Sequence, residues 1–276
     1  MKTKSIFFMA TIIALSCTSC ARNFYQIYQA DPTSNTINDR LISENQDYTI
    51  TYNLWDNGGN FGFIFHNKTD QNIYVNMKET FFIQNGIAHN YFQDRTFSNS
   101  NDNRLSSSHS VSAAGYTGFN SFWNLLQGSK KTTVSSSSSQ GVTFKEEEIV
   151  CIPAHTSKTF SEYNIVNNIY RDCDLSRYPK KKEIRTKRFS KFDTPYIFSN
   201  RIVYTKGESD SNIKHNIEHE FYVSAITNYR EKDIIKIEQD SFCGEKGENI
   251  EVFTINQTSN KFYLKYDNKG GGYRKH

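Results

Sequence analysis

The sequence has little proline and no apolar run long enough to cross a bilayer. Only four of its 276 residues are proline, whereas 14% are aromatic, mostly Phe and Tyr. This composition, together with plentiful Asn, Ser and Thr, favours pleated sheet with polar turns over a helical bundle. The apolar stretch at residues 6–15 has about ten residues. A membrane-spanning helix requires about 20.

A strong charge of either sign is also missing. The full chain has a formal net charge of +4. Removal of residues 1–19 would leave 257 residues with 31 basic and 29 acidic side chains, a net charge of +2. Near-neutral charge argues against a general binder of nucleic acid or of anionic membranes. We therefore expect no nucleic-acid partner.

The N-terminus has the features of an export signal. Lys2 and Lys4 provide a short positive region, residues 6–15 are apolar, and Ser16-Cys17-Thr18-Ser19-Cys20 follows. An apolar segment of this length with small residues after it is typical of a signal peptide. The sequence therefore predicts an exported protein.

Cys20 is the predicted lipidation site. Thr18, Ser19 and Cys20 resemble the lipobox of bacterial lipoproteins, in which small residues precede a modified cysteine. Cys17 stands where Leu or Ile is usual, and it is itself the competing acceptor; plain secretory cleavage and an uncleaved anchor also compete with lipidation at Cys20. The resemblance implies diacylation (palmitate among the chains) at Cys20. Two acyl chains suffice for a stable membrane anchor.

Three further cysteines follow in the exported part. Cys151 lies in an apolar segment and is predicted to be a buried, inert thiol. Cys173 and Cys243 lie in polar, turn-like contexts, and an oxidising compartment allows disulfides. Three pairings are open, and a Cys173–Cys243 disulfide is the one we favour.

Alternation of apolar and polar residues predicts strands along most of the chain. In residues 48–54 every second residue is apolar, as in a half-buried strand. Asp56-Asn57-Gly58-Gly59 and Asn85-Gly86 are predicted turns, because Asn-Gly adopts positive φ at little cost. Further strands are expected at 61–66, 73–77, 79–83, 149–152, 196–198, 201–204, 213–225, 234–238, 250–255 and 262–266. This spacing predicts an all-β fold, an antiparallel immunoglobulin-like β-sandwich.

The predicted domain organisation has four parts. Residues 1–19 form the signal peptide, and residues 20–46 form the lipidated cysteine and a tether, in which 24–28 could be a first short strand. Residues 47–268 form one β-sandwich domain. Residues 269–276 form a disordered tail.

A long Ser-rich insertion interrupts the predicted domain at residues 98–143. It contains five consecutive serines at 135–139, a composition that buries too little apolar surface to become ordered. Within it, residues 115–128 are rich in aromatic side chains. They could form a short helix that docks on the sandwich, or a loop that meets a partner, since Phe119, Phe122, Trp123 and Leu126 would share one helical stripe.

The segment 180–188 carries six basic residues among nine. A solvated loop or a lysine-guarded edge strand is the simpler interpretation. Contact with phosphate head groups or an acidic polymer is the functional alternative.

No catalytic, cofactor or metal site is predicted. His215 and His219 are four apart, but the apolar residues around them recur at every second position, which indicates a strand. Four strand residues span roughly 13 Å, so the two imidazoles cannot share one metal ion with bonds of about 2 Å. Neither a Gly-x-Ser-x-Gly elbow nor a phosphate-binding glycine loop is present.

Residues 52–70, 81–86 and 152–157 resemble an uncharacterised family of Bacteroidetes lipoproteins. The resemblance extends from residue 20 to about residue 267 and implies lineage and compartment, with no activity. In that phylum, surface-exposed lipoproteins often carry acidic residues soon after the lipidated cysteine. Residues 21–24 contain none, which favours the periplasmic face of the outer membrane of a Gram-negative bacterium.

These observations predict a lipid-anchored envelope protein that binds without catalysing a reaction. Its expected partners are membrane lipid, through the anchor, and an envelope protein or polysaccharide. The first alternative is a carbohydrate-binding lipoprotein, in which Trp55, Tyr91 or Trp123 would stack on sugar rings, although the tryptophans could equally be core residues. The second alternative is an envelope hydrolase.

Overall fold

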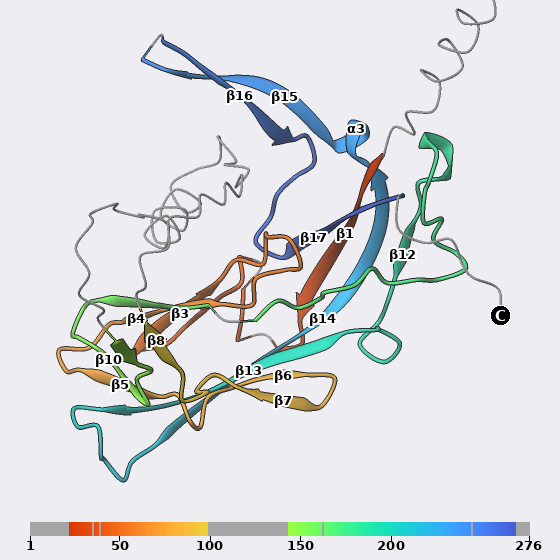
Figure 1. Ribbon diagram of the computed structural model, residues 1–276. Coiled ribbons are helices and arrows are strands. Elements are labelled where there is room, and N and C mark those ends of the chain that lie inside the picture. Colours follow the sequence, from red (N-terminus) through yellow and green to blue (C-terminus); the bar gives the residue numbers. More distant parts are fainter. Residues whose placement is uncertain are drawn as a thin grey trace, which may run out of the picture.

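The computed structural model describes residues 22–34, 36–38, 40–98, 143–161, 163–243 and 245–268. Within them the protein is built almost entirely from antiparallel strands arranged in two main sheets (Figure 1). The prediction of an all-β antiparallel sandwich is confirmed. Its immunoglobulin-like character stays a prediction.

The larger sheet has nine strands, six of which follow the order β10-β5-β13-β14-β1-β17. β12 pairs with β14, and the β6–β7 hairpin joins the sheet through β13. The strands are β1 (Asn23–Pro32), β5 (Ile73–Asn76), β6 (Phe81–Gln84), β7 (Ile87–Asn90), β10 (Ile149–Ile152), β12 (Thr186–Arg188), β13 (Ile197–Lys206), β14 (His215–Arg230) and β17 (Lys261–Asp267).

The smaller sheet has four strands in the order β11-β4-β3-β2. They are β2 (Ile42–Glu44), β3 (Tyr48–Tyr52), β4 (Phe63–Asn67) and β11 (Ser157–Phe160). Two separate pairs complete the strands: β8 (Thr96–Ser98) with β9 (Thr143–Lys145), and β15 (Ile235–Phe242) with β16 (Glu245–Phe253). Two short helical turns, η2 (Lys181–Glu183) and α3 (Glu231–Ile234), lie between strands.

Aromatic side chains fill the space between the two sheets. Tyr52 of β3 lies edge-on against Phe221 of β14, with ring centroids 5.3 Å apart. Phe65 of β4 contacts Tyr204 of β13 with centroids 5.7 Å apart. All four rings are buried. Such edge-to-face contacts add to the stabilisation that burial of the rings provides, so these pairs hold the sandwich together.

β1 is an interior strand of the larger sheet. It pairs with β14 on one side and with β17 on the other. Tyr28 lies in the main core, whereas Tyr25 and Ile27 point to the other face and belong to a second cluster. The short strand suggested at 24–28 is therefore confirmed, and it extends over residues 23–32, which belong to the sheet and not to the predicted tether. The residues preceding the turn at Pro32 are buried on both faces, and a strand in that environment loses the polar–apolar alternation by which the sequence reveals strands.

The second cluster lies between β1 and the region where the β15–β16 hairpin meets β17. Its buried members are Tyr25, Ile27, Ile234 and Phe253, and Trp55, Tyr229, Ile235, Ile255 and Tyr263 pack against them. This cluster covers the face of β1 opposite the main core.

Most predicted strands are confirmed, with shifted ends. The segments at 196–198 and 201–204 are one continuous strand, β13, and the strand at 213–225 extends to Arg230 in β14. Asn85 and Gly86 both have positive φ, 48° and 80°, and connect β6 to β7 as the Asn-Gly signal predicts.

The predicted Ser-rich insertion begins and ends on paired strands. Ser98 of β8 is opposite Thr143 of β9. The aromatic stretch at 115–128, including Trp123, lies outside the described residues, as does the tail at 269–276.

Candidate functional site

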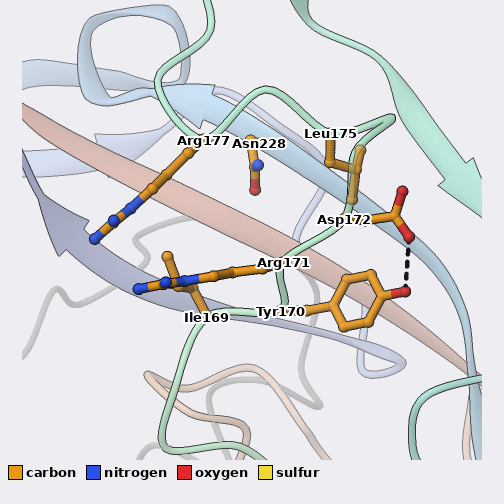
Figure 2. A pocket seen from close by; sticks show the side chains of 7 residues that line it. All are labelled: Ile169, Tyr170, Arg171, Asp172, Leu175, Arg177 and Asn228. Atoms are coloured by element: carbon orange, nitrogen blue, oxygen red, sulfur yellow. Dashed lines mark hydrogen bonds between the residues drawn. The ribbon is translucent and has the colours of Figure 1, made fainter. Parts of the chain in front are cut away.

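Residues 169–188 lie in the chain between β11 of the smaller sheet and β13 of the larger sheet. They contact β1 and β14. Their first part forms a pocket of about 130 Å³. Figure 2 shows its lining, which consists of Ile169, Tyr170, Arg171, Asp172, Leu175, Arg177 and Asn228. Three of the lining residues are charged, namely Arg171, Asp172 and Arg177.

Two buried amides hold this segment in place. Gln26 of β1 donates to the carbonyl of Tyr170 (2.9 Å) and to Oδ1 of Asn228 (2.8 Å), and its own Oε1 accepts from the amide of Tyr170 (2.7 Å). Asn228 of β14 donates to the carbonyl of Ser176 (2.9 Å). Because both amides are almost completely buried, each needs these partners. The stretch from Tyr170 to Ser176 is therefore held at both of its ends.

An ion pair network borders the pocket. Lys187 Nζ lies 2.6 Å from Asp172 Oδ2 and 3.2 Å from Asp174 Oδ2, and the hydroxyl of Tyr170 donates to Asp172 at 3.0 Å. The hydrogen bond from Lys187, with that from the amide of Asp174, lowers the pKa of Asp172 to about 2. The same pairing raises the pKa of Lys187. Asp172 is thus a stable anion whose charge is compensated within the segment.

Arg171 and Arg177 supply the positive charge of the pocket. In Figure 2 both side chains extend to the same side, away from Tyr170 and Asp172. The guanidinium of Arg177 lies over the ring of Tyr178 at 5.0 Å, and the hydroxyl of Tyr266 donates to the Arg177 carbonyl at 2.5 Å. Guanidinium groups match the geometry of carboxylate and phosphate. Neither arginine was among the residues that the sequence singled out.

The predicted lipidation site, Cys20, and its rival Cys17 lie outside the described residues. The first described residue, Arg22, donates its amide to the side chain of Asn268 at 3.0 Å. The first residue that the structure describes is thus already bonded to the last residue before the C-terminal tail.

The residues proposed to stack on sugars do not form one surface. Tyr91 is only 2% exposed, and its hydroxyl donates to the buried Asn200 at 2.9 Å, so it cannot contact a sugar. Trp55 is half-buried in the second cluster, with its ring edge-on to Phe253 at 4.9 Å. Trp123 lies outside the described residues. Trp55 serves mainly as a core residue.

His215 and His219 both lie on β14, so the predicted strand is confirmed. His219 is buried and bonds to Tyr52, whereas the ring of His215 stacks on Tyr204 at 4.9 Å. Within the described ranges, no group of three or more His, Cys, Asp and Glu side chains is placed to hold a metal ion.

The predicted Cys173–Cys243 disulfide is wrong. Cys151, Cys173 and Cys243 are all free and exposed. Cys173 lies in the segment beside β14, whereas Cys243 lies at the end of the β15–β16 hairpin. The prediction that Cys151 is buried is also wrong: in β10 exposed and buried residues alternate, and Cys151 falls on the exposed face between Val150 and Ile152.

No family model matches the chain, and searches of curated proteins and of solved structures also give no match. In the part of the chain that the structure describes, no helix is both long and apolar enough to cross a membrane.

Proposed function

We propose that the protein is an envelope lipoprotein, anchored by lipid on Cys20, that acts as a non-catalytic binding or structural module. One observation carries this proposal: β1 begins at Asn23, three residues after the lipobox cysteine, and is an interior strand of the larger sheet. Three extended residues span at most about 11 Å. A lipid on Cys20 would therefore hold the β-sandwich directly against the bilayer.

An anchored cysteine so close in sequence to the first strand would suit a module that works at the membrane surface. We propose the periplasmic face of the outer membrane as its location, because no acidic residue follows Cys20 before Phe24. The family of Bacteroidetes lipoproteins that the sequence resembles supports this compartment.

Binding is favoured over catalysis by the chemistry of the candidate site. Its carboxylate network, Asp172 with Lys187, is internally compensated, and burial of Gln26 and Asn228 serves to fix the backbone. The arginines of the pocket are cations that recognise anionic groups. An envelope protein or polysaccharide remains the proposed further partner.

Carbohydrate binding is the second candidate, and Trp55 is the described residue on which it depends. Its ring is half-buried and lies beside Tyr263 at 5.3 Å. A Trp55→Phe variant that lost binding on a glycan array while keeping its unfolding midpoint would favour this candidate over the binding of a protein.

The anchor is tested by metabolic labelling with palmitate in the native host. We expect label in the wild type and in Cys17→Ala, and none in Cys20→Ala. Label that survives in Cys20→Ala but disappears in Cys17→Ala would move the anchor to Cys17. Absence of label from all three proteins would overturn the proposal.

The partner is tested by crosslinking in intact cells, followed by mass spectrometry. We expect capture of a defined envelope protein or polysaccharide by the wild type and loss of that capture in Cys20→Ala. A reaction product detected when the purified protein is incubated with isolated envelope would instead support an envelope hydrolase.

A further inference from the structure

Positive charge is concentrated in one short part of the chain. Residues 171–188 carry eight basic and three acidic side chains, a net charge of +5. The whole chain has a net charge of +4, so the other 258 residues together amount to −1. A near-neutral protein thus has one strongly basic segment.

Four cations of this segment stay available to a partner. Lys180, Lys181, Lys182 and Arg185, which we call the basic face, are exposed and form no ion pair with any described residue. Glu183, the acid among them, accepts a hydrogen bond from the amide of Lys180 at 2.9 Å. With four cations and this one carboxylate, residues 180–185 keep a net charge of +3.

The neighbouring carboxylates are already paired with other cations. Asp172 and Asp174 share Lys187. On and beside α3, Glu231 lies 2.9 Å from Lys265 and Asp233 lies 2.6 Å from Arg230. These internal pairs leave the positive charge of the basic face in excess at this end of the molecule.

Direct contacts place the basic face beside the beginning of the fold. The ring of Phe24, at the start of β1, lies 5.1 Å from that of Tyr178, two residues before Lys180. The pKa of Asp233 is lowered first by Arg230 and further by the nearby charge of Lys181. Figure 1 shows the start of β1, α3 and the loop that precedes β12 at the same end of the molecule.

The position of the anchor follows from covalent geometry. Cys20 is two residues from Arg22, so their Cα atoms are at most about 7 Å apart. A lipid at Cys20 would enter the bilayer at the end of the domain that carries the basic face. Lysine and arginine side chains are attracted to an anionic membrane surface.

We propose that the basic face binds the anionic phospholipid headgroups of the leaflet that holds the Cys20 lipid, and thereby fixes the orientation of the β-sandwich on the membrane. This inference rests on the proposed anchor. The lipid supplies attachment, and Lys180, Lys181, Lys182 and Arg185 supply a second, salt-sensitive contact. The opposite end of the domain is then presented to partners.

In the full lipidated chain, two native cysteine thiols can report which end of the domain faces the membrane. Cys173 is exposed seven residues before Lys180, and Cys151 is exposed on β10, at the far end of the strand order. The protein is placed in vesicles of phosphatidylcholine, with or without phosphatidylglycerol, and each thiol is titrated with a bulky, membrane-impermeant maleimide. Rates are divided by those measured in non-ionic detergent micelles, which corrects for the intrinsic reactivity of each thiol.

We expect phosphatidylglycerol to slow labelling of Cys173 and to leave that of Cys151 unchanged, with the protection lost at high salt. The triple variant Lys180→Gln, Lys181→Gln, Lys182→Gln should weaken the docking equilibrium on the order of 100-fold and restore labelling. The matched control replaces three exposed lysines elsewhere, Lys158→Gln, Lys236→Gln and Lys246→Gln, and should keep the protection.

Three results would overturn the inference. They are protection that is equal with and without phosphatidylglycerol, protection that survives in the triple variant, and loss of protection in the matched control. Binding of a soluble acidic polysaccharide without lipid-dependent protection would assign the basic face to a polymer. Failure of the anchor is recognised separately, because the protein would then not float with vesicles of phosphatidylcholine alone.

Discussion

The hydroxyl of Tyr52 and Nδ1 of His219 lie 2.9 Å apart in the core, where they join the smaller sheet to the larger one. Tyr52 is fully buried and His219 is 2% exposed. Burial lowers the pKa of His219 to about 4 and raises that of Tyr52 above its ordinary value. Both groups are therefore neutral in the folded protein at neutral pH. Of the two histidines on β14, His219 provides this polar contact within the sandwich, whereas His215 stacks on Tyr204.

The first prediction concerns acid stability. The folded protein holds His219 neutral down to about pH 4, whereas the unfolded chain protonates it below its ordinary pKa of 6.5. The unfolded state thus binds more protons in this window, and stability falls as the pH decreases through it. The loss should reach about 3 kcal/mol, at about 1.4 kcal/mol per pH unit. Urea unfolding across the window should show this slope, and His219→Gln should flatten it.

A control separates this histidine from the carboxylates. The pKa of Asp172 is lowered from 3.8 to about 2, chiefly by Lys187, so its contribution is lost only below the window of His219. Asp172→Asn should keep the slope between pH 6.5 and 4. A slope that is unchanged in His219→Gln would contradict the assignment.

The second prediction concerns the hydrogen bond itself. Tyr52→Phe should lower the free energy of unfolding by about 1–3 kcal/mol, because Nδ1 of His219 is left buried without its partner. Chemical denaturation measures the change. Tyr74→Phe is the matched control, since Tyr74 is half-buried and its hydroxyl has only a long contact of 3.4 Å with Asn72; a loss of equal size there would remove the special role of Tyr52.

The third prediction compares two glycines. Gly59 and Gly86 both have positive φ, +77° and +80°, but a Cβ on Gly59 would lie 2.8 Å from the ring of Phe262, whereas one on Gly86 would meet nothing within 4 Å. Gly86→Ala should cost about 1 kcal/mol for backbone strain alone. Gly59→Ala should cost a further 1–3 kcal/mol, approximately, through overpacking. Equal thermal midpoints for the two variants would contradict the packing around Phe262.

The fourth prediction concerns the hydrogen bonds by which Gln26 holds the candidate site. Gln26→Leu removes the nearer acceptor of the Tyr170 amide, which keeps only a longer contact of 3.3 Å with the hydroxyl of Tyr28. It also leaves the side-chain oxygen of Asn228 without the donor that Gln26 supplies. Hydrogen exchange at Tyr170 should accelerate, and stability should fall by about 2 kcal/mol. Gln29→Leu on the same strand is the control, because its side chain makes only a 3.5 Å contact with Asp31. Unchanged exchange at Tyr170 in Gln26→Leu would show that the segment is held by other means.

The fifth prediction concerns the thiols. The native mature protein should consume three equivalents of a water-soluble thiol reagent without denaturant, at Cys151, Cys173 and Cys243, because all three are free and exposed. Single Cys→Ser variants should each lose one equivalent. Consumption of one equivalent of reagent, rising to three after reduction, would show that two of the three cysteines form a disulfide.

Local patterns sufficed to predict much of the fold. The strict alternation in 213–225 predicted the strand β14, and that strand geometry alone excluded a metal ion shared by His215 and His219. Asn85-Gly86 predicted a hairpin, because positive φ at two successive residues is a property of those residues. Strand alternation and turn formation depend on residues that are neighbours in the sequence, so both can be predicted from the sequence alone.

Features that join distant segments could not be predicted in this way. Gln26 meets Tyr170 across 144 residues and Asn228 across 202, and nothing in the local sequence of β1 indicates either partner. The interior position of β1 was missed for a related reason, since burial on both faces removes alternation. The Arg171–Arg177 pocket depends on the same contacts.

By itself, the sequence determined the all-β antiparallel class, most strands and the basic run at 180–188, because composition, periodicity and charge are local. Only the tertiary structure decided that β1 starts inside the sheet immediately after the Cys20 region, that the basic run lies at that same end, and that the cysteines stay apart. These are pairings between segments far apart in the chain, and their register is set by which faces become buried together.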